Sequence, residues 1–222
     1  MPLLRGRDVH KYYIEDSDLF LIGTFPSMNL NIEDYPSIKK HLEQYLPKLN
    51  QTGETFINEN GKKERTRKKT SGEWFETQDS ISYWEDFEKP KIVWGEISDK
   101  PKFAVEDAGY YAEATTFLMT GEKLKFLLAI LNSKVSEWYF NLIGTTTGMG
   151  TNRWKKYKIE LLPIKVPTES QEQTIEILVN EILSIKKRNA SADTTDLENE
   201  IDQLVYQLYD LTEEEIEIIE NG

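Results

Sequence analysis

The sequence predicts an α+β fold, with a strand-rich region that contains inserted helices over residues 1–166 and a helical segment over residues 167–222. Short runs of β-branched and aromatic residues, bounded by turn residues, recur over the first half of the chain and are typical of strands. Apolar residues then recur at spacings of three and four over residues 124–142, which is the period of an amphipathic helix. After Pro167 every apolar pattern is helical. We therefore expect two regions that meet near residue 166.

Near the N-terminus, two apolar runs at residues 12–14 and 19–22 flank the acidic turn of residues 15–18 and predict a β-hairpin. Tyr35-Pro36 predicts the start of a helix over residues 37–46, because proline suits a first helical position. His41 lies on this helix. We interpret it as a packed or solvent-edge residue, since the only other histidine, His10, brings no carboxylate cluster that would complete a metal site.

The middle of the chain predicts strands over residues 89–94 and 102–105, separated by a turn at residues 98–101. Residues 110–119 extend this strand-rich zone up to the helix of residues 124–142. Gly144 follows that helix and suits a left-handed C-terminal position. The loop of residues 145–152 carries hydroxyls, Gly148 and Gly150, so its backbone N–H groups can approach a ligand oxygen. A short strand is expected over residues 157–163.

The C-terminal region predicts amphipathic helices over residues 175–185 and 197–209, joined by the polar linker of residues 189–195. Thr212 and Glu215 have the spacing of a capping box and predict the start of a third, short helix. Residues 168–222 hold 15 acidic residues against three cations, which accounts for the whole net charge of −12. Residues 1–167 are therefore neutral, and the low isoelectric point says little about what they bind.

Composition excludes several classes of protein. The sequence has no cysteine, which removes disulfides and thiolate chemistry, and no apolar run long enough to span a membrane. The N-terminus has no apolar signal region. We expect a cytoplasmic protein.

The clearest candidate binding residues form a basic run in a region of low apolar content. The run holds six cations within residues 62–69: Lys62, Lys63, Arg65, Arg67, Lys68 and Lys69. Two interpretations stand at about equal weight. In the first, the run is a solvated mobile loop. In the second, it contacts nucleic-acid phosphates, because clustered cations gain affinity for a nucleic-acid backbone by releasing its counterions. Aromatic residues follow at 74–87, and we favour the interpretation that they belong to the hydrophobic core over the alternative that they stack on bases.

A second candidate segment mixes cations, an aromatic ring and polar side chains: Thr151, Asn152, Arg153, Trp154, Lys155 and Lys156. Asn pairs bidentately with adenine and Arg with guanine in the major groove, so Asn152 or Arg153 can reach a base edge. The alternative, at even odds, is a strand edge protected from aggregation by its charges.

The search for catalytic motifs finds none. The only Gly-Lys pair, Gly61-Lys62, lacks the flanks of a phosphate-binding loop, and Gly148-Met149-Gly150 follows a helix rather than a strand. No acidic residue has a lysine two positions later, and no Asn-Pro-Pro-aromatic motif occurs. Binding is therefore the default expectation, and no catalytic or metal site is predicted.

Several segments together suggest a family. They are LLRGRDVHKY at residues 3–12, YPSIKKHLEQY at 35–45, KPKIVWGEI at 89–97, FLLAILNSKVSEWYF at 126–140, LLPI at 161–164, Glu172-Gln173 and the tail at 197–220. In this order they resemble the TaqI-like C-terminal specificity domain of DNA adenine methyltransferases and of type IIG restriction-modification enzymes. The specificity subunits of type I systems are similar over the FLLAILNSK helix, the proline-closed segment and the Glu-Gln helix.

The resemblance implies a non-catalytic domain that reads a double-stranded DNA target for the methyltransferase or nuclease module of the same parent chain. S-adenosylmethionine and magnesium are then expected only in the catalytic modules, with no cofactor here. Residues 1–166 become the DNA-reading domain, and the helices of residues 167–222 pack on it or on the catalytic module. The alternative is a protein-interaction module that docks through the acidic helices. An enzyme in its own right is a third, weaker alternative.

Overall fold

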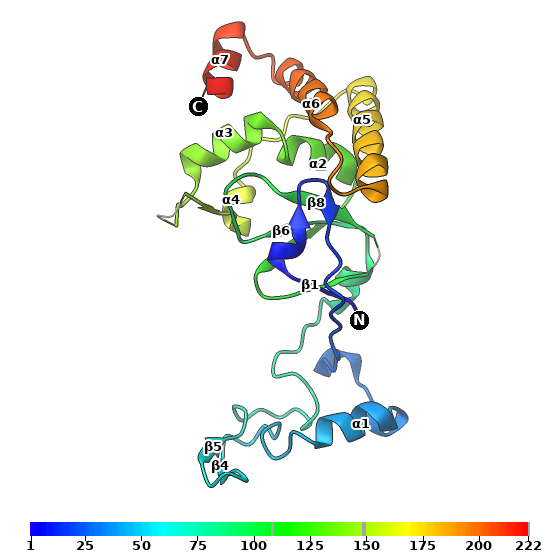
Figure 1. Cartoon of the computed structure of the whole chain (residues 1–222), viewed down its shortest axis with the longest axis vertical. Coiled ribbons are helices and arrows are strands. Elements are labelled where there is room, and N and C mark those ends of the chain that lie inside the picture. Colours follow the sequence, from blue (N-terminus) through cyan, green and yellow to red (C-terminus); the bar gives the residue numbers. More distant parts are fainter. Residues whose placement is uncertain (108, 148–149, 222) are drawn as a thin grey trace. The chain divides into compact units, whose positions relative to one another are not determined.

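The computed structural model describes residues 1–107, 109–147 and 150–221 and divides the chain into two compact units (Figure 1). Unit 1 comprises Met1 and residues 20–86, and unit 2 comprises residues 2–19 and 87–222. Both helices and strands are present, so the predicted α+β class is confirmed. The predicted boundary at residue 166 lies inside unit 2, and as a division of function it stays a prediction.

Unit 2 contains most of the regular structure. Its strands are β1 (Leu3–Leu4), β2 (Val9–His10), β3 (Tyr13–Ile14), β6 (Lys91–Gly95), β7 (Ile97–Ser98), β8 (Phe103–Glu106), β9 (Tyr111–Ala112), β10 (Thr116–Thr120) and β11 (Asn152–Arg153). Its helices are the short η1 (Gly6–Asp8), then α2 (Leu124–Leu131), α3 (Lys134–Ile143), α4 (Lys156–Ile159), α5 (Glu169–Arg188), α6 (Thr195–Leu208) and α7 (Glu213–Asn221). The short helix η4 (Trp84–Glu88) crosses the boundary between the units.

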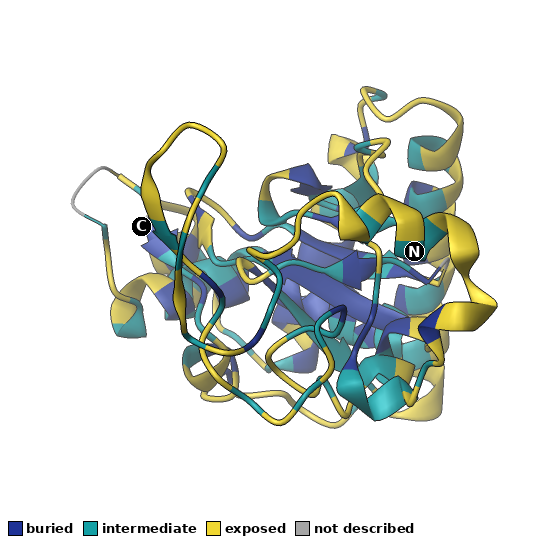
Figure 2. Cartoon of the chain, turned by 90° about the horizontal axis from the view of Figure 1, so that it is seen from below, coloured by how far each residue is buried: buried dark blue, intermediate teal, exposed yellow. Residues whose placement is uncertain are grey.

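A three-stranded antiparallel sheet in the order β10-β6-β8 lies at the centre of unit 2. Its buried strands are dark blue in Figure 2. Trp94 of β6 faces Phe117 of β10 in the register on one side and Phe103 of β8 on the other. The predicted strands at 89–94 and 102–105 are therefore confirmed, each within two residues at its ends.

The three C-terminal helices share the core of this sheet. Figure 1 shows α5 beside α2, and the two helices are in contact. Their buried faces join one apolar cluster with the sheet, through residues such as Ile182, Ile201, Val205 and Ile219. Within the described residues the inner faces of these helices pack on the strand-rich region, and a contact with a catalytic module stays a prediction. The predicted capping box is confirmed, because the Glu215 N–H donates to Thr212 Oγ1 and the Thr212 N–H to the Glu215 carboxylate.

The single helix predicted over residues 124–142 is wrong, since it breaks between α2 and α3. Ser133 has extended backbone angles and its hydroxyl accepts from the Ser136 N–H, so it starts a new helix. Asn132 exchanges two hydrogen bonds with the Phe103 backbone, at 3.0 and 3.1 Å. The Asp202 carboxylate accepts from the Lys134 N–H at 2.9 Å. Hydrogen bonds to β8 and α6 thus interrupt the helix, although the helical spacing of the apolar residues continues across the break.

Three further expectations are corrected. Gly144 has φ −68°, and its small size matters instead because a Cβ would lie 2.7 Å from the Phe140 carbonyl oxygen. Residues 157–163 form no strand, because the chain turns into α4. The N-terminal hairpin pairs β3 with β2 rather than with residues 19–22, and Tyr12 makes its tight turn at φ 68°.

Unit 1 is built of short elements: η2 (Pro26–Met28), η3 (Ile32–Asp34), α1 (Pro36–Glu43), β4 (Thr55–Ile57) and β5 (Lys63–Arg65). Pro36 is the first residue of α1, which confirms the predicted helix start, although the helix ends three residues early. The region at residues 51–72 is not a featureless loop, because β4 and β5 pair there as an antiparallel hairpin.

The segments LLRGRD and KPKIVWGEI are far apart in the sequence, but they lie against each other through one glycine of each. Gly6 and Gly95 lie against each other, and a Cβ on Gly95 would stand 2.6 Å from the Gly6 carbonyl oxygen. No larger residue fits at either position without moving backbone. Beside them the Arg5 guanidinium donates twice to the buried Asp8 carboxylate, both at 2.8 Å.

Candidate nucleic-acid interface

The basic run of residues 62–69 lies on and after β5, and most of its cations face solvent. Lys62, Lys63, Lys68 and Lys69 are exposed, and in the described part of the chain none of them forms an ion pair with an acid. Exposed lysines without carboxylate partners are available to neutralise phosphates. Their contact with DNA stays a prediction.

The two arginines of the run differ from the lysines. Arg65 is exposed, and in the described residues only its Nε donates a hydrogen bond, to the Gly53 carbonyl at 2.8 Å. Arg67 is half-buried and donates to three backbone carbonyls, those of Leu49, Trp74 and Glu76. Desolvation lowers the pKa of its guanidinium. Arg67 therefore stabilises unit 1 with three of its five N–H donors, so it is a weaker candidate for a phosphate contact than the exposed lysines.

The second candidate segment lies in unit 2, where Trp154 is a core residue. Its ring is 2% exposed and stacks on Phe140 with centroids 3.8 Å apart. Its Nε1 donates to the Ser98 carbonyl, while its own carbonyl accepts from Trp94 Nε1 at 2.7 Å. The prediction of Trp154 as a loop contact for DNA is not supported, because the ring is buried by its own protein.

The cations beside Trp154 are paired with one acid. Arg153 and Lys155 donate to the same oxygen of Glu96, at 2.7 and 2.8 Å, and both remain partly exposed. The Lys155 hydrogen bond, helped by Arg153, holds the pKa of Glu96 below its usual value although burial acts the other way. Glu96 thus offsets part of the positive charge of this segment.

Of the remaining residues of the segment, Thr151 and Asn152 contact residues 146 and 147, and Lys156 begins α4. Thr146 bridges to Asn152, and the hydroxyls of Thr147 and Thr151 are 2.6 Å apart. Asn152 is buried and donates to the Asn141 side chain at 2.8 Å, so it does not face a base edge. Lys156 is exposed, with Glu160 at 3.7 Å. Gly148, expected in the loop, lies outside the described residues.

The two basic segments belong to different units, and each is a separate candidate for contact with DNA. Unit 2 also contains Arg7, a cation that the sequence did not single out. Arg7, between the structural residues Gly6 and Asp8, is exposed and lines a small polar hollow with His10 and Lys102. Lys102 is tied to Asp99 at 2.8 Å there. An isolated Arg in a turn gave no sequence signal.

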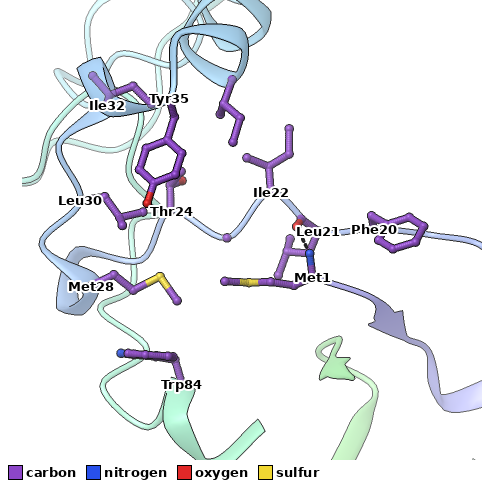
Figure 3. Close-up of a pocket in the computed structure, with 12 residues that line it drawn as sticks. Met1, Phe20, Leu21, Ile22, Thr24, Met28, Leu30, Ile32, Tyr35 and Trp84 are labelled. Carbon is purple, nitrogen blue, oxygen red and sulfur yellow. Dashed lines mark hydrogen bonds between the residues drawn. The ribbon is translucent and has the colours of Figure 1, made fainter. Parts of the chain in front are cut away.

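Unit 1 also contains an apolar cavity of about 550 Å³. Figure 3 shows Trp84, Met28 and Tyr35 on one side of it, with Met1 and Ile22 on the other. Its lining carries no charged side chain, so it is not a phosphate site. The sequence gave no signal for it, because its walls come from short irregular segments.

Among the described residues, no three His, Asp or Glu side chains lie close enough together to hold a metal ion. In the same residues no helix has the length and apolar character needed to cross a bilayer.

Comparison of the sequence with known proteins identifies the family of this chain. Residues 1–164 match the TaqI-like C-terminal specificity domain, so the chain belongs to this family and the resemblance seen in the sequence is confirmed. Among curated proteins the chain is similar to the type II methyltransferase M.BstVI of Geobacillus stearothermophilus, with 23% identity over 226 residues. The match covers 100% of this chain and 36% of that protein, so the chain spans about a third of its relative. The acidic-helix alternative gains no support, because the inner faces of those helices pack within unit 2.

Proposed function

We propose that this chain recognises a double-stranded DNA target for a restriction-modification enzyme and performs no catalysis itself. The observation that carries the proposal is the set of exposed lysines at positions 62, 63, 68 and 69, which have no acid partner in the described residues. Membership of a specificity-domain family and similarity to a type II methyltransferase support it. Phosphate contacts of this kind position a protein on DNA, and base contacts then give the specificity.

The catalytic chemistry, site-specific adenine methylation with or without cleavage, we assign to other modules of a parent enzyme. S-adenosylmethionine and magnesium belong with those modules in this proposal. The chain's own contribution is to hold the duplex in register.

A salt titration of duplex binding tests the proposal. The affinity of the chain for a labelled duplex should fall as salt rises, with a slope of about 0.9 per phosphate that is neutralised. The double substitution Lys68→Ala/Lys69→Ala should weaken binding to all sequences alike and reduce that slope by about 1 to 2.

The matched control is Lys39→Ala/Lys40→Ala, which removes the same charge from α1 in the same unit. Lys39 already pairs with Glu33 at 2.5 Å, so the control should change binding little. No binding to any duplex, or equal losses in the two double variants, would contradict the proposal.

A further inference from the structure

A hollow at the base of the β4–β5 hairpin has the composition of a nucleotide site. It measures about 370 Å³ and lies wholly within unit 1. The side chains that give it chemical character are an indole, an amide, two hydroxyls, a lysine and a carboxylate, from Trp74, Asn50, Thr52, Thr70, Lys69 and Glu54. An aromatic wall with adjacent hydrogen-bonding groups and a cation is what a base and its phosphate require.

The walls of the hollow are fixed by partly buried hydrogen bonds. The Arg67 guanidinium joins its two rims, since it donates to the Leu49 carbonyl at 2.8 Å and to the Trp74 carbonyl at 2.5 Å. The Gln51 amide, 6% exposed, donates to the Glu73 and Glu76 carbonyls at 2.8 and 2.9 Å and accepts from the Thr70 hydroxyl. A site held in this way is preorganised, so little entropy is lost when a ligand enters it.

Asn50 and Trp74 keep their polar or aromatic surface available to the hollow. Both are half-buried, and in the described residues the Asn50 side-chain amide forms no hydrogen bond. The Trp74 ring meets Phe75 edge-on, with centroids 5.8 Å apart. Lys69 is exposed at the rim beside Lys68. Glu54 is the one acid in the lining, and a carboxylate there accepts from an exocyclic amino group.

The concave shape decides what kind of nucleotide fits. Base edges in an intact duplex lie recessed in the grooves and are read by side chains that project into them. A hollow receives a base only after the base has left the stack, which costs a few kcal/mol, on the order of the gain from stacking on an aromatic ring.

We propose that this hollow binds one unstacked nucleotide of the DNA. Its base lies against Trp74 with the Asn50 amide on its hydrogen-bonding edge, and its phosphate lies at Lys69. This inference rests on the proposed function. It adds a deformation of the duplex that specificity-domain membership does not by itself entail.

The test compares two labelled duplexes that are identical except for one unpaired, bulged nucleotide. Because a bulged base has already left the stack, the wild-type chain should bind the bulged duplex on the order of tenfold more tightly. The variants Asn50→Ala and Trp74→Phe should reduce this preference for the bulged duplex, because they remove the hydrogen-bonding amide and most of the stacking surface of the hollow. The control Asn60→Ala, an exposed amide between β4 and β5, should keep the preference.

The outcomes separate the two proposals. If the wild-type chain binds the intact duplex in a salt-dependent way but shows no preference for the bulge, or if Asn50→Ala and Trp74→Phe both keep the full preference, the nucleotide site is refuted and DNA recognition stands. If the chain binds neither duplex, both proposals fail. Urea unfolding of each variant establishes that unit 1 remains folded.

Discussion

The indole ring of Trp154 lies parallel to the ring of Phe140, with an interplanar angle of 10° and centroids 3.8 Å apart. Phe103 also contacts the Trp154 ring, in an edge-on arrangement. Residue 154 thus joins α3 and the central sheet, while its neighbours Arg153 and Lys155 stay at the surface. Alternate residues of one short basic segment therefore serve stability and charge separately.

The first prediction concerns Trp154→Ala. The loss of a buried ring and the cavity that remains should lower the free energy of unfolding by about 3–5 kcal/mol. Tyr157→Ala removes an aromatic ring that is 59% exposed and should change it by about 0.5 kcal/mol or less. Urea unfolding followed by circular dichroism measures both. If Trp154→Ala leaves stability intact and weakens only DNA binding, the ring contacts DNA after all.

The second prediction concerns Glu96→Gln. Glu96 holds Arg153 and Lys155, so its neutralisation should release both cations and strengthen duplex binding with a steeper salt dependence. Glu200→Gln makes the same charge change at an exposed position of α6 and serves as the control. Equal effects of the two substitutions would show that the segment of residues 153–156 does not face DNA.

The third prediction concerns the buried ion pair of Lys91 and Glu106, directly opposite each other on β6 and β8. Lys91→Met leaves the Glu106 carboxylate without this partner and should cost about 3–5 kcal/mol of stability. The double variant Lys91→Met/Glu106→Leu should recover much of that loss, because no charge is then left buried. A double-mutant cycle from urea unfolding decides. Additive losses would mean that the pair is not coupled.

The fourth prediction concerns pH and Asp202, which is 4% exposed and accepts from the N-terminal N–H of α3. Burial raises the pKa of Asp202, although the Lys134 N–H and the charges of Lys11 and Lys134 oppose that shift and Glu220 adds to it. The folded state therefore favours the protonated acid, and this contribution to stability is lost as pH rises above the value of an unfolded aspartate, about 3.9.

Asp202→Asn keeps an oxygen acceptor for the Lys134 N–H and removes the titration. Relative to the wild type, the variant should be more stable at pH 7.5 than at about pH 4.5, because at pH 7.5 the wild type buries an ionised carboxylate and the variant does not. Urea unfolding at both values measures the difference. A difference of the opposite sign would mean that the ionised carboxylate stabilises the native state.

Elements stabilised by contacts between neighbouring residues could be predicted from the sequence. Features that depend on contacts with residues far away in the sequence could not. The apolar periods of α5 and α6 and the start of α1 at Pro36 can be read from neighbouring residues. The break after α2 depends on Phe103, about 30 residues from Asn132. The structural role of Arg67 could not be predicted, because its hydrogen-bond acceptors are main-chain carbonyls and these do not depend on the residue types in the sequence. The exposure of the lysines at positions 62, 63, 68 and 69 followed from composition alone.

Arg67 and Gln51 grip main-chain oxygens outside the β4–β5 hairpin, and those oxygens are the same whatever side chains accompany them. The stretch at residues 55–65 can thus be exchanged for another of equal length while its attachment stays as it is. Such grafting offers a route to redirecting a protein of this kind to a new target without redesigning its interior.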